Sequence, residues 1–443
     1  AVALFAVYSA GMAAFPLHPN LTKAELLTAA RRSSAVVIIG TGTGTGAGEV
    51  IAALDSMGVA RIACDPVSEV RAESPLAPAP RASSDESPVP REWSATASLL
   101  LQSSGTTGPP KIVRRSAAAI DAVAVNVANC VGLSPSDRVL GVIPVCHAYG
   151  IENCLMSPLL AGSAVHLSNG FDVPLVMEQV TRSGITVLPG TAFLFEMLAQ
   201  RAEKPARVPD LRCAYSAGSQ LPRSVFDAFH DRFGVPIGQL YGMTEVGSIT
   251  FNDPGADGFD PESCGPGMAG VTFRIVDPAT QRVDQPLPAD TEGEVAVRAS
   301  SMLCEYVDDD ASPFVDGFVM TGDLGRLGAR GHLTITGRLK LLIDVGASKV
   351  NPIEVEQTLA GHRAVKEAII VPVRVTDTLV RLKAVVVRAL DPATGRAVHV
   401  EPDELRRYVR ERLSLHKVPR LIEFRDSLPR TASGKVMRAS LQS

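Results

Sequence analysis

The chain carries Ser103-Ser104-Gly105-Thr106-Thr107-Gly108-Pro109-Pro110-Lys111 directly after the apolar run Leu99-Leu100-Leu101. The apolar run predicts a strand, and the segment after it predicts a loop that holds nucleotide phosphates. Glycines let the backbone approach phosphate oxygens, hydroxyl and N–H groups donate hydrogen bonds, and lysine offsets charge. The spacing of a Walker loop, G-x-x-x-x-G-K-[ST], is absent. Taken alone, the segment is explained more simply as a surface turn.

Further motifs follow this loop in a fixed order along the chain. Together with the loop they resemble the adenylate-forming enzymes, a superfamily of acyl-CoA synthetases, nonribosomal-peptide adenylation domains and luciferases. The resemblance runs over residues 7–440, and its pattern is nearest to acyl- and aryl-CoA ligases. The motifs are Tyr241-Gly242-Met243-Thr244-Glu245, Thr321-Gly322-Asp323-Leu324-Gly325, Gly331-His332-Leu333-Thr334-Ile335-Thr336-Gly337-Arg338-Leu339-Lys340 and Pro429-Arg430-Thr431-Ala432-Ser433-Gly434-Lys435.

The resemblance implies a mixed α/β fold with two domains of unequal size. Residues 1–338 are expected to form a large AMP-binding domain of layered α/β subdomains plus a β-rich subdomain. Residues 339–443 are expected to form a small, mobile α/β lid domain, with a hinge near Lys340. The residue pattern agrees, because helical and strand-like runs alternate over 117–200, as in layered α/β domains. The smaller domain is predicted to hold strands near 368–373 and 383–388 and a charged helix near 402–414.

Composition narrows the function classes. A chain of 443 residues is long enough for two or three cores. The net charge of −4 argues against a general nucleic-acid-binding surface, and no apolar run reaches the ~20 residues that cross a bilayer. Seven cysteines without a C-x-x-C pair are typical of reduced thiols, so we expect a cytoplasmic protein that binds neither nucleic acid nor membrane.

The beginning of the chain is short for the superfamily. The first residue is not methionine, and the segment 7–18 resembles a stretch that these enzymes carry some way into the large domain. We therefore expect a fragment, a trimmed form or one module of a longer polypeptide.

A second nucleotide motif lies in the segment 35–65. A strand-like run over 35–39 is followed by a glycine-rich stretch in which Gly42, Gly44 and Ala47 fit G-x-G-x-x-G/A, and Asp65 follows at a suitable distance. This pattern allows a dinucleotide-binding oxidoreductase. The superfamily resemblance implies instead an ordinary βαβ unit of the large domain.

The resemblance implies that a carboxylate attacks the α-phosphate of ATP, which releases pyrophosphate and leaves an acyl-AMP. Both reactants are anionic, so catalysis depends on positioning and charge neutralisation. Thr244 is expected to contact the phosphates, and Glu245 to hold the Mg²⁺ that bridges them, since one carboxylate plus phosphate oxygens suits magnesium. The loop residues expected to hold the β- and γ-phosphates are Ser103, Ser104, Gly105, Thr106, Thr107, Gly108 and Lys111.

The same resemblance supplies a nucleoside site. The stretch Ser216-Ala217-Gly218 is expected to lie beneath adenine, and Tyr241, followed by Gly242, to stack on the ring. Asp323 is the expected partner of the ribose hydroxyls, because one carboxylate can accept from both. Arg338 is expected to reach the same ribose or the α-phosphate.

Lys435 is the strongest catalytic candidate. Gly434 frees the backbone of its loop, and an ammonium between the substrate carboxylate and the α-phosphate stabilises charge that builds in the transition state. Rotation at Lys340 is expected to withdraw Lys435 and to admit a phosphopantetheine thiol, with Gly346 in the thiol tunnel. An ordinary exposed lysine is the alternative explanation for Lys435.

The acid is expected to bind near Cys146-His147-Ala148-Tyr149-Gly150. Between Cys146 and Ser163 there is no aspartate to hold an α-ammonium, so the resemblance implies a non-amino acid substrate. His147 either borders the site or is a structural histidine. Glu152 and Asn153 either contact a hydroxylated acid or occupy exposed helix positions. The residues expected to line the acyl pocket are His147, Tyr149, Gly190, Thr191 and Met243.

Four positions depart from the superfamily pattern. Ile112 replaces a usual glycine, Arg114 and Arg115 add charge, and Ala117 replaces a common histidine. These departures suit a third alternative, a nucleotide-binding module without catalysis. Our prediction is an AMP-forming acid–thiol ligase that uses ATP and Mg²⁺ and transfers the acyl group to coenzyme A. A domain that loads the phosphopantetheine of a carrier protein is the alternative within the same class.

Overall fold

A computed structural model describes most of the chain. The described residues are 2–17, 23–33, 35, 37–40, 60–64, 70–72, 97–103, 111–168, 172–201, 208–307, 312, 314–345, 348–376, 379–430 and 436–442. Several predicted site residues lie outside this set, and so do the positions of the dinucleotide motif. They are Ser104, Gly105, Thr106, Thr107, Gly108, Gly346 and Lys435 of the predicted site, and Gly42, Gly44, Ala47 and Asp65 of the motif.

The segment that contains Leu99–Leu101 and Ser103 lies on a hairpin. Strand β5 (Ser98–Gln102) is buried over Leu99–Leu101, as its apolar residues predict, and pairs with antiparallel β6 (Ile112–Ser116). Strand β1 (Ala13–Ala14) joins β5, and β16 (Glu305–Tyr306) joins β6, so this sheet has the order β1-β5-β6-β16. Ser116 and Gly132 cap α4 (Ala117–Val131): Ser116 Oγ accepts from the N–H of Ala119, and Gly132 has a φ of 63°. The remaining N-terminal elements are α1 (Val2–Ser9), α2 (Lys23–Arg32), β2 (Val37–Gly40), β3 (Ala60–Cys64) and β4 (Val70–Ala72).

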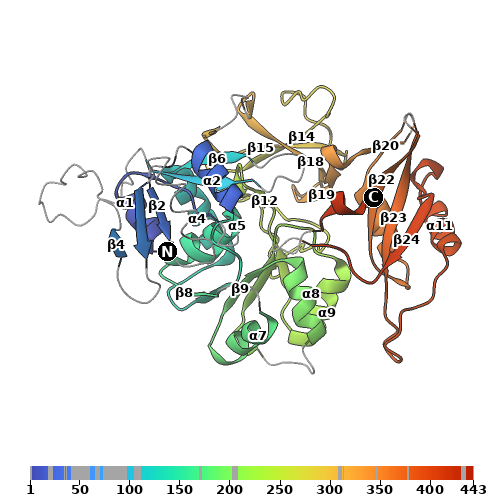
Figure 1. Ribbon diagram of the computed structural model, residues 1–443, viewed down its shortest axis with the longest axis horizontal. Helices are drawn as coiled ribbons and strands as arrows, with labels where there is room; N and C mark the ends of the chain where they lie inside the picture. The colour runs from blue at the N-terminus through green and yellow to red at the C-terminus, as the bar shows by residue number, and fades with distance from the viewer. Residues whose placement is uncertain are drawn as a thin grey trace, which may run out of the picture.

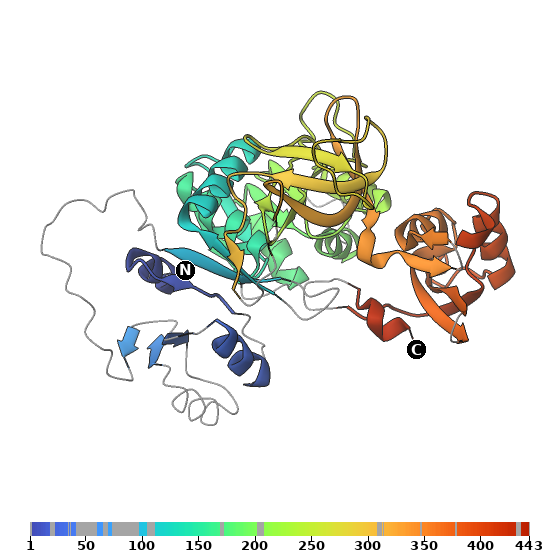
Figure 2. The ribbon, with the colours of Figure 1, turned by 90° about the horizontal axis from the view of Figure 1, so that it is seen from above.

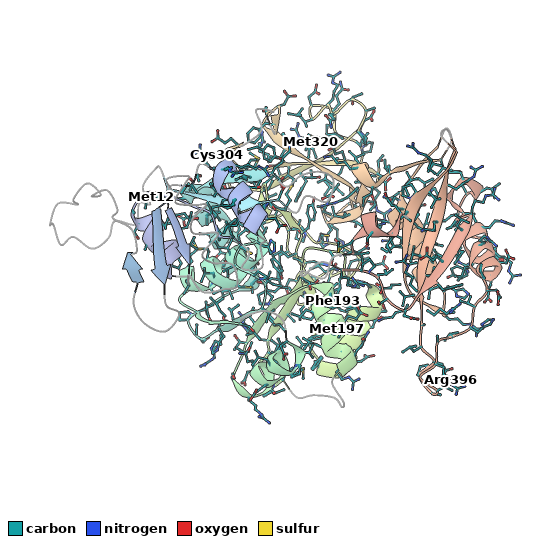
Figure 3. The ribbon with its side chains drawn as sticks, viewed as in Figure 1. Met12, Phe193, Met197, Cys304, Met320 and Arg396 are labelled. Carbon is teal, nitrogen blue, oxygen red and sulfur yellow. The ribbon has the colours of Figure 1, made fainter. Side chains whose placement is uncertain are left out.

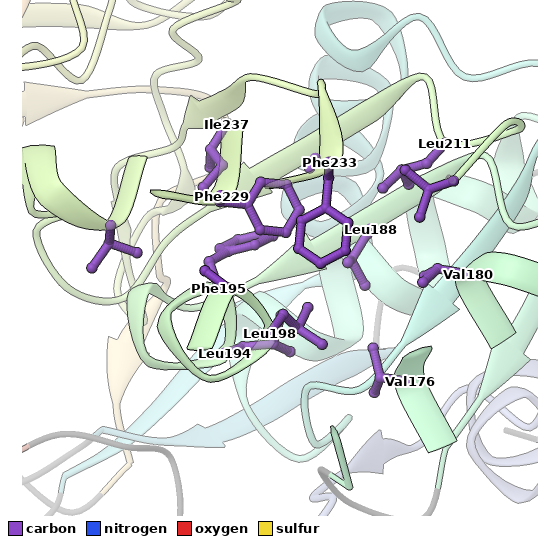
Figure 4. Packing of buried hydrophobic residues seen from close by; sticks show 14 of the residues in the cluster. Val176, Val180, Leu188, Leu194, Phe195, Leu198, Leu211, Phe229, Phe233 and Ile237 are labelled. Carbon is purple, nitrogen blue, oxygen red and sulfur yellow. The ribbon is translucent and has the colours of Figure 1, made fainter. Parts of the chain in front are cut away.

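A parallel sheet follows, with the strand order β11-β10-β9-β7-β8. Its apolar strands alternate with helices, and the core between them includes Phe195, Phe229 and Phe233, which Figure 4 shows in contact. The strands are β7 (Arg138–Gly141), β8 (Ala164–Leu167), β9 (Val187–Gly190), β10 (Cys213–Ser216) and β11 (Ile237–Gln239). The helices are α5 (Ala148–Ile151), the π-helix η1 (Glu152–Met156), α6 (Ser157–Leu160), α7 (Val173–Arg182), α8 (Ala192–Arg201) and α9 (Arg223–Phe233).

A β-rich portion continues the large domain. Antiparallel strands pair in the order β14-β15-β18-β17, and β19 also pairs with β18. A short hairpin of β12 (Gly242–Met243) and β13 (Gly247–Ser248) lies before them in the chain. The strands of this sheet are β14 (Thr272–Val276), β15 (Gly293–Arg298), β17 (Phe314–Val315), β18 (Phe318–Leu327) and β19 (Leu333–Arg338).

The C-terminal portion has its own sheet and its own core (Figures 1 and 2). Strand β22 (Val365–Thr376) pairs with antiparallel β23 (Leu379–Arg388), which pairs with parallel β24 (Leu421–Arg425). The strands predicted near 368–373 and 383–388 lie within β22 and β23. The charged helix α11 (Pro402–Arg410) ends before the predicted residue 414. The other elements are η2 (Leu339–Leu341), β20 (Ile343–Val345), β21 (Ser348–Val350), α10 (Pro352–Ala360), η3 (Leu415–Lys417) and η4 (Arg438–Leu441).

This architecture confirms the predicted fold class, a large N-terminal α/β domain with a β-rich part and a small C-terminal domain. Among the helices that the structure describes, none has the length and apolar character needed to cross a bilayer.

Candidate active site

Two hydrogen bonds close the base of the predicted phosphate loop. The N–H of Ser103 donates to the carbonyl of Lys111 at 2.9 Å, and the N–H of Lys111 donates to Ser103 Oγ at 2.9 Å. Ile112, which replaces the usual glycine, is buried and begins β6. The described ends of this segment, Ser103 and Lys111, therefore lie side by side at the end of a hairpin formed by β5 and β6. We call β5, this segment and β6 the phosphate hairpin.

Three predicted site segments meet where parallel strands of the central sheet end. Gly190 ends β9 and Ser216 ends β10, and the two residues are paired across the ladder. Ser216 is also paired with Gln239, two residues before Tyr241. The crevice at the carboxyl ends of parallel strands is the usual ligand site of open α/β sheets. The topology thus brings the predicted acyl segment and the predicted adenine segment together.

The adenine segment has two features that suit a bound group. Ser216 is buried, and its Oγ has no hydrogen-bond partner among the described parts of the chain. Gly218 has a φ of 83°, a conformation that side-chain-bearing residues rarely adopt. Ala217 is buried, and its N–H donates to the carbonyl of Gly190 at 3.1 Å. A buried hydroxyl of this kind is suited to a partner supplied by a ligand.

The motif Tyr241–Glu245 forms a tight turn on the hairpin of β12 and β13. A Cβ on Gly242 would lie 2.5 Å from the carbonyl oxygen of Gly247, so only glycine fits. Thr244 is half-buried in this turn. We call residues 241–248 the nucleotide turn.

Tyr241, Asp323 and Arg338 form one hydrogen-bonded cluster, in which Asp323 is buried and the other two residues are partly exposed. The Tyr241 hydroxyl donates to Asp323 Oδ2 at 2.7 Å, and Arg338 Nε lies 2.5 Å from Asp323 Oδ1. Asp323 and Arg338 face each other across β18 and β19. Burial, followed by the Asp323 charge, raises the pKa of Tyr241 well above its usual value. Burial acts to lower the pKa of Arg338, but Asp323 outweighs it and the pKa is raised.

Glu245 is the predicted magnesium carboxylate. Burial raises its pKa, while a hydrogen bond from Tyr306 and the charge of Lys111 act in the opposite direction. The Tyr306 hydroxyl donates to Glu245 Oε1 at 3.3 Å, and Lys111 Nζ lies 4.3 Å from the centroid of the Tyr306 ring. A carboxylate close to the phosphate hairpin fits a magnesium ion that takes its remaining ligands from phosphates and water.

Three of the predicted acyl residues, Tyr149, Gly190 and Thr191, lie at the end of β9. The Tyr149 hydroxyl donates to the carbonyl of Gly190 at 2.9 Å and to that of Tyr215 at 3.3 Å, so it shapes this wall through backbone contacts. Thr191 Oγ1 accepts from the N–H of Leu194 at the start of α8. A Cβ on Gly190 would lie 2.8 Å from the Phe195 ring. His147 is exposed before α5, and Met243 is half-buried.

The expectation of exposed helix positions for Glu152 and Asn153 is wrong. Both residues are buried in the π-helix η1. One Glu152 oxygen contacts Arg115 NH1, and the other accepts from Ser248, so the carboxylate is engaged within the protein. From the sequence, Arg115 was expected only to add charge beside the phosphate loop. Its position two residues after Val113, on the same face of β6, was the available signal for a buried partner.

The C-terminal portion contacts the large domain through α8. Lys366 Nζ lies 3.3 Å from Glu196 Oε1, and Arg430 Cζ lies 5.4 Å from the centroid of the Phe193 ring. Figure 3 labels Phe193 and Met197 on the same helix. Lys340, the predicted hinge residue, is exposed in η2 between the two portions.

Fold and site together define the class of adenylate-forming enzymes. A family model described as "AMP-binding enzyme" matches residues 1–307, and one described as "AMP-binding enzyme C-terminal domain" matches residues 354–435. The chain therefore belongs to the AMP-binding enzyme family, as its motifs predicted.

Named relatives agree with an acid–thiol ligase. The chain is 31% identical to the sulfoacetate–CoA ligase of Cupriavidus necator, over 80% of this chain and 68% of that protein. It is 29% identical to a feruloyl-CoA synthase of Amycolatopsis sp., over 99% of this chain and 85% of that protein. The crystal structure of ATP-bound MatB from Rhodopseudomonas palustris shares the fold, with a TM-score of 0.85 at 24% identity, over 100% of this chain and 85% of that one.

The names of these relatives describe ligases that join an acid to coenzyme A, which agrees with the class that the motifs predict. The chain spans 62% of the length of some curated relatives and 85% of others. The activity of the whole protein is therefore put forward below as a proposal.

Proposed function

We propose that the protein activates a carboxylic acid lacking an α-amine to an acyl-AMP and transfers the acyl group to the thiol of coenzyme A. This proposal rests on one observation: Gly190, Ser216 and Tyr241 lie at one edge of the parallel sheet. The predicted acyl segment therefore lies beside the predicted nucleotide segments, at the usual ligand site of such sheets. Tyr306 contacts both Lys111 of the phosphate hairpin and Glu245. The lysine and the carboxylate are the groups proposed to act on the triphosphate.

In the first half-reaction, a carboxylate oxygen forms a bond to the α-phosphorus, and the bond between that phosphorus and the bridging oxygen of pyrophosphate breaks. In the second, the coenzyme A sulfur, having lost its proton to solvent, bonds to the acyl carbon. The carbon–oxygen bond to AMP then breaks. The protein contributes mainly position and charge, which is where most of the barrier reduction arises in such transfers.

The predicted charged residues have proposed roles in these two steps. Asp323 accepts from the ribose hydroxyls, held in place by Tyr241 and Arg338. Glu245 would hold Mg²⁺, which screens the charge of the triphosphate. Lys435 bridges the carboxylate and the α-phosphate. Its segment is bracketed by Arg430 and Val436, which pair with each other, and Arg430 contacts Phe193 beside the acyl segment.

The acid is proposed to be apolar around its carboxylate. The Tyr149 hydroxyl donates to backbone carbonyls, and Glu152 is paired with Arg115, so neither group is offered to the acid. Phe193 adds apolar surface three residues after Gly190. The proposed thiol is that of coenzyme A, the acceptor named for the relatives. A carrier-protein phosphopantetheine is the alternative acceptor for the same chemistry.

Acid-dependent ATP–pyrophosphate exchange tests this function. The assay is run over aryl, alicyclic and aliphatic acids, with Lys435→Ala beside the wild type. We expect exchange with one class of acid and its loss in the variant. A second arm adds coenzyme A or a phosphopantetheinylated carrier protein and detects the thioester by mass spectrometry. No exchange with any acid, in a protein that binds ATP, would favour a non-catalytic module.

A further inference from the structure

A buried ion pair, Arg115–Glu152, connects the phosphate hairpin to the nucleotide turn, and we propose that this pair positions the two relative to each other for ATP binding. The inference rests on the proposed function and deepens it. It assigns positioning roles to two residues outside the groups proposed to touch the substrates.

Arg115 fixes the end of the phosphate hairpin in three directions. Its side chain is 0% exposed and lies on β6, four residues after Lys111. Arg115 NH1 contacts Glu152 Oε1, Nε donates to the carbonyl of Ser301 at 3.0 Å, and NH2 donates to that of Ala119 at 3.4 Å. A planar guanidinium with donors on several sides holds such contacts at set angles.

Glu152 carries the connection onward to the nucleotide turn. Its second oxygen, Oε2, accepts hydrogen bonds from the N–H and the hydroxyl of Ser248, both at 3.0 Å. Gly247 packs directly on the ion pair: a Cβ there would lie 2.7 Å from Glu152 Oε1 and 2.8 Å from Arg115 NH2. The backbone of the nucleotide turn, which carries Tyr241 and Glu245, thus packs directly against the charged groups of Arg115 and Glu152.

The network extends to the acyl segment. Asn153 Nδ2 donates to Ser248 Oγ at 3.0 Å, and the Tyr215 hydroxyl donates to Asn153 Oδ1 at 3.2 Å. Tyr149 in turn donates to the carbonyls of Tyr215 and Gly190. Glu152 and Asn153 lie in the π-helix η1, a conformation that is frequent at functional sites.

Stability alone is a poor explanation for the pair. Replacing a buried ion pair by apolar residues of similar volume often leaves the stability of the protein unchanged or raises it. Removal of one partner alone is destabilising, because it leaves the other charge buried and unpaired. A charged, fully hydrogen-bonded pair fixes the relative orientation of the two segments that it joins. An apolar pair has no directional contacts and does not fix this orientation. Here those segments are the ones proposed to hold one triphosphate.

The double variant Arg115→Met/Glu152→Leu tests this inference. Its melting temperature and its affinity for a non-hydrolysable ATP analogue are measured, the latter by calorimetry with Mg²⁺ and with EDTA. We expect a melting temperature within a few degrees of the wild type. We expect the Kd for the analogue to rise about tenfold under both conditions, because the change acts on the protein frame. The KM for the acid is expected to rise by a smaller factor than this Kd, because the acyl segment is joined to the pair indirectly, through Asn153 and Tyr215.

A second variant leaves both charges in place. Ser248→Ala removes the hydroxyl contacts to Glu152 and Asn153 but keeps the backbone hydrogen bond to Glu152, so the Kd should rise only a few-fold. The matched control is Asp137→Asn/Arg212→Gln, which disrupts another ion pair of the large domain, at 2.8 Å. That pair lies at the amino ends of β7 and β10, opposite the site, so its loss should lower the melting temperature and leave the Kd unchanged.

Unchanged affinity in both the double variant and Ser248→Ala, beside a wild type that binds the analogue, would overturn this inference alone. A wild type that binds no ATP analogue would contradict the proposed function and this inference with it.

Discussion

The hydroxyl of Tyr306 donates a hydrogen bond to Oε1 of Glu245 at 3.3 Å. The residues just before Tyr306 also contact the nucleotide turn: the N–H of Leu303 donates to the carbonyl of Glu245 at 2.7 Å. The strand of Tyr306, β16, also pairs with β6, directly after Lys111. Tyr306 therefore stands between the lysine of the phosphate hairpin and the carboxylate proposed to hold magnesium.

The first prediction concerns this tyrosine. Tyr306→Phe removes the hydrogen bond to Glu245 and keeps the aromatic ring beneath Lys111. The loss of about 1 kcal/mol should raise the Mg²⁺ concentration for half-maximal adenylation roughly five-fold. Tyr306→Leu also removes the cation–π contact, and it should raise the KM for ATP by a further factor of about two to five. Equal Mg²⁺ dependence in the wild type and Tyr306→Phe would show that the hydroxyl has no part in holding Glu245.

The second prediction tests the tight turn at Gly242. In Gly242→Ala the new Cβ would lie 2.5 Å from the carbonyl oxygen of Gly247, so the nucleotide turn must shift. ATP binding measured by calorimetry should weaken by tenfold or more. The control is Gly270→Ala, where φ is 72° and nothing lies within 4 Å of the added Cβ. That change should cost about 1 kcal/mol of stability through backbone strain and leave ATP affinity unaltered. Comparable ATP affinities in the two variants would contradict the geometry of the turn.

The third prediction is a pH dependence of stability. Hydrogen bonds from Arg212, Thr186 and Ser134 hold the pKa of Asp137 well below its usual 3.8. A carboxyl group whose pKa is lower in the folded protein than in the unfolded protein stabilises the fold at pH values above the unfolded-state pKa. This stabilisation is lost as the pH falls through the folded-state pKa. Asp137→Asn should therefore be less stable than the wild type by about 1–3 kcal/mol near pH 7. Urea unfolding should show this difference shrinking below about pH 4. A difference that stays constant down to pH 3 would argue against an ionised Asp137 in the folded protein.

The fourth prediction concerns the contact between the small domain and α8. Lys366→Ala removes the ion pair to Glu196, whose partners are 41% and 23% exposed. Partly exposed pairs contribute about 0–1 kcal/mol, so the rate of ATP–pyrophosphate exchange should fall by no more than about five-fold. Transfer from a synthetic acyl-AMP to coenzyme A should stay at the wild-type rate. A larger loss in transfer than in exchange would show that this contact serves the other half-reaction.

The sequence predicted the fold well where the signal was local. The strand Leu99–Leu101 and the strands of the small domain follow from runs of apolar residues. Tyr241 and Asp323 were predicted as nucleotide ligands, but their mutual hydrogen bond joins residues 82 positions apart and left no local trace.

The buried contacts were the hardest to predict. Arg115 and Glu152 look like solvated charges in the sequence, and only the folding of β6 against η1 brings them together. Tyr306 lies 61 residues from Glu245, in a strand of two residues, which is too short to carry a periodic pattern.

The most direct test of the central claim follows the oxygen of the acid. A carboxylic acid labelled with ¹⁸O in both carboxylate positions is turned over with ATP and coenzyme A, and the nucleotide product is analysed by mass spectrometry. Attack of the carboxylate on the α-phosphorus predicts AMP with one ¹⁸O atom and unlabelled pyrophosphate. ADP as the product with label in inorganic phosphate, or AMP without label, would contradict an acyl-adenylate intermediate.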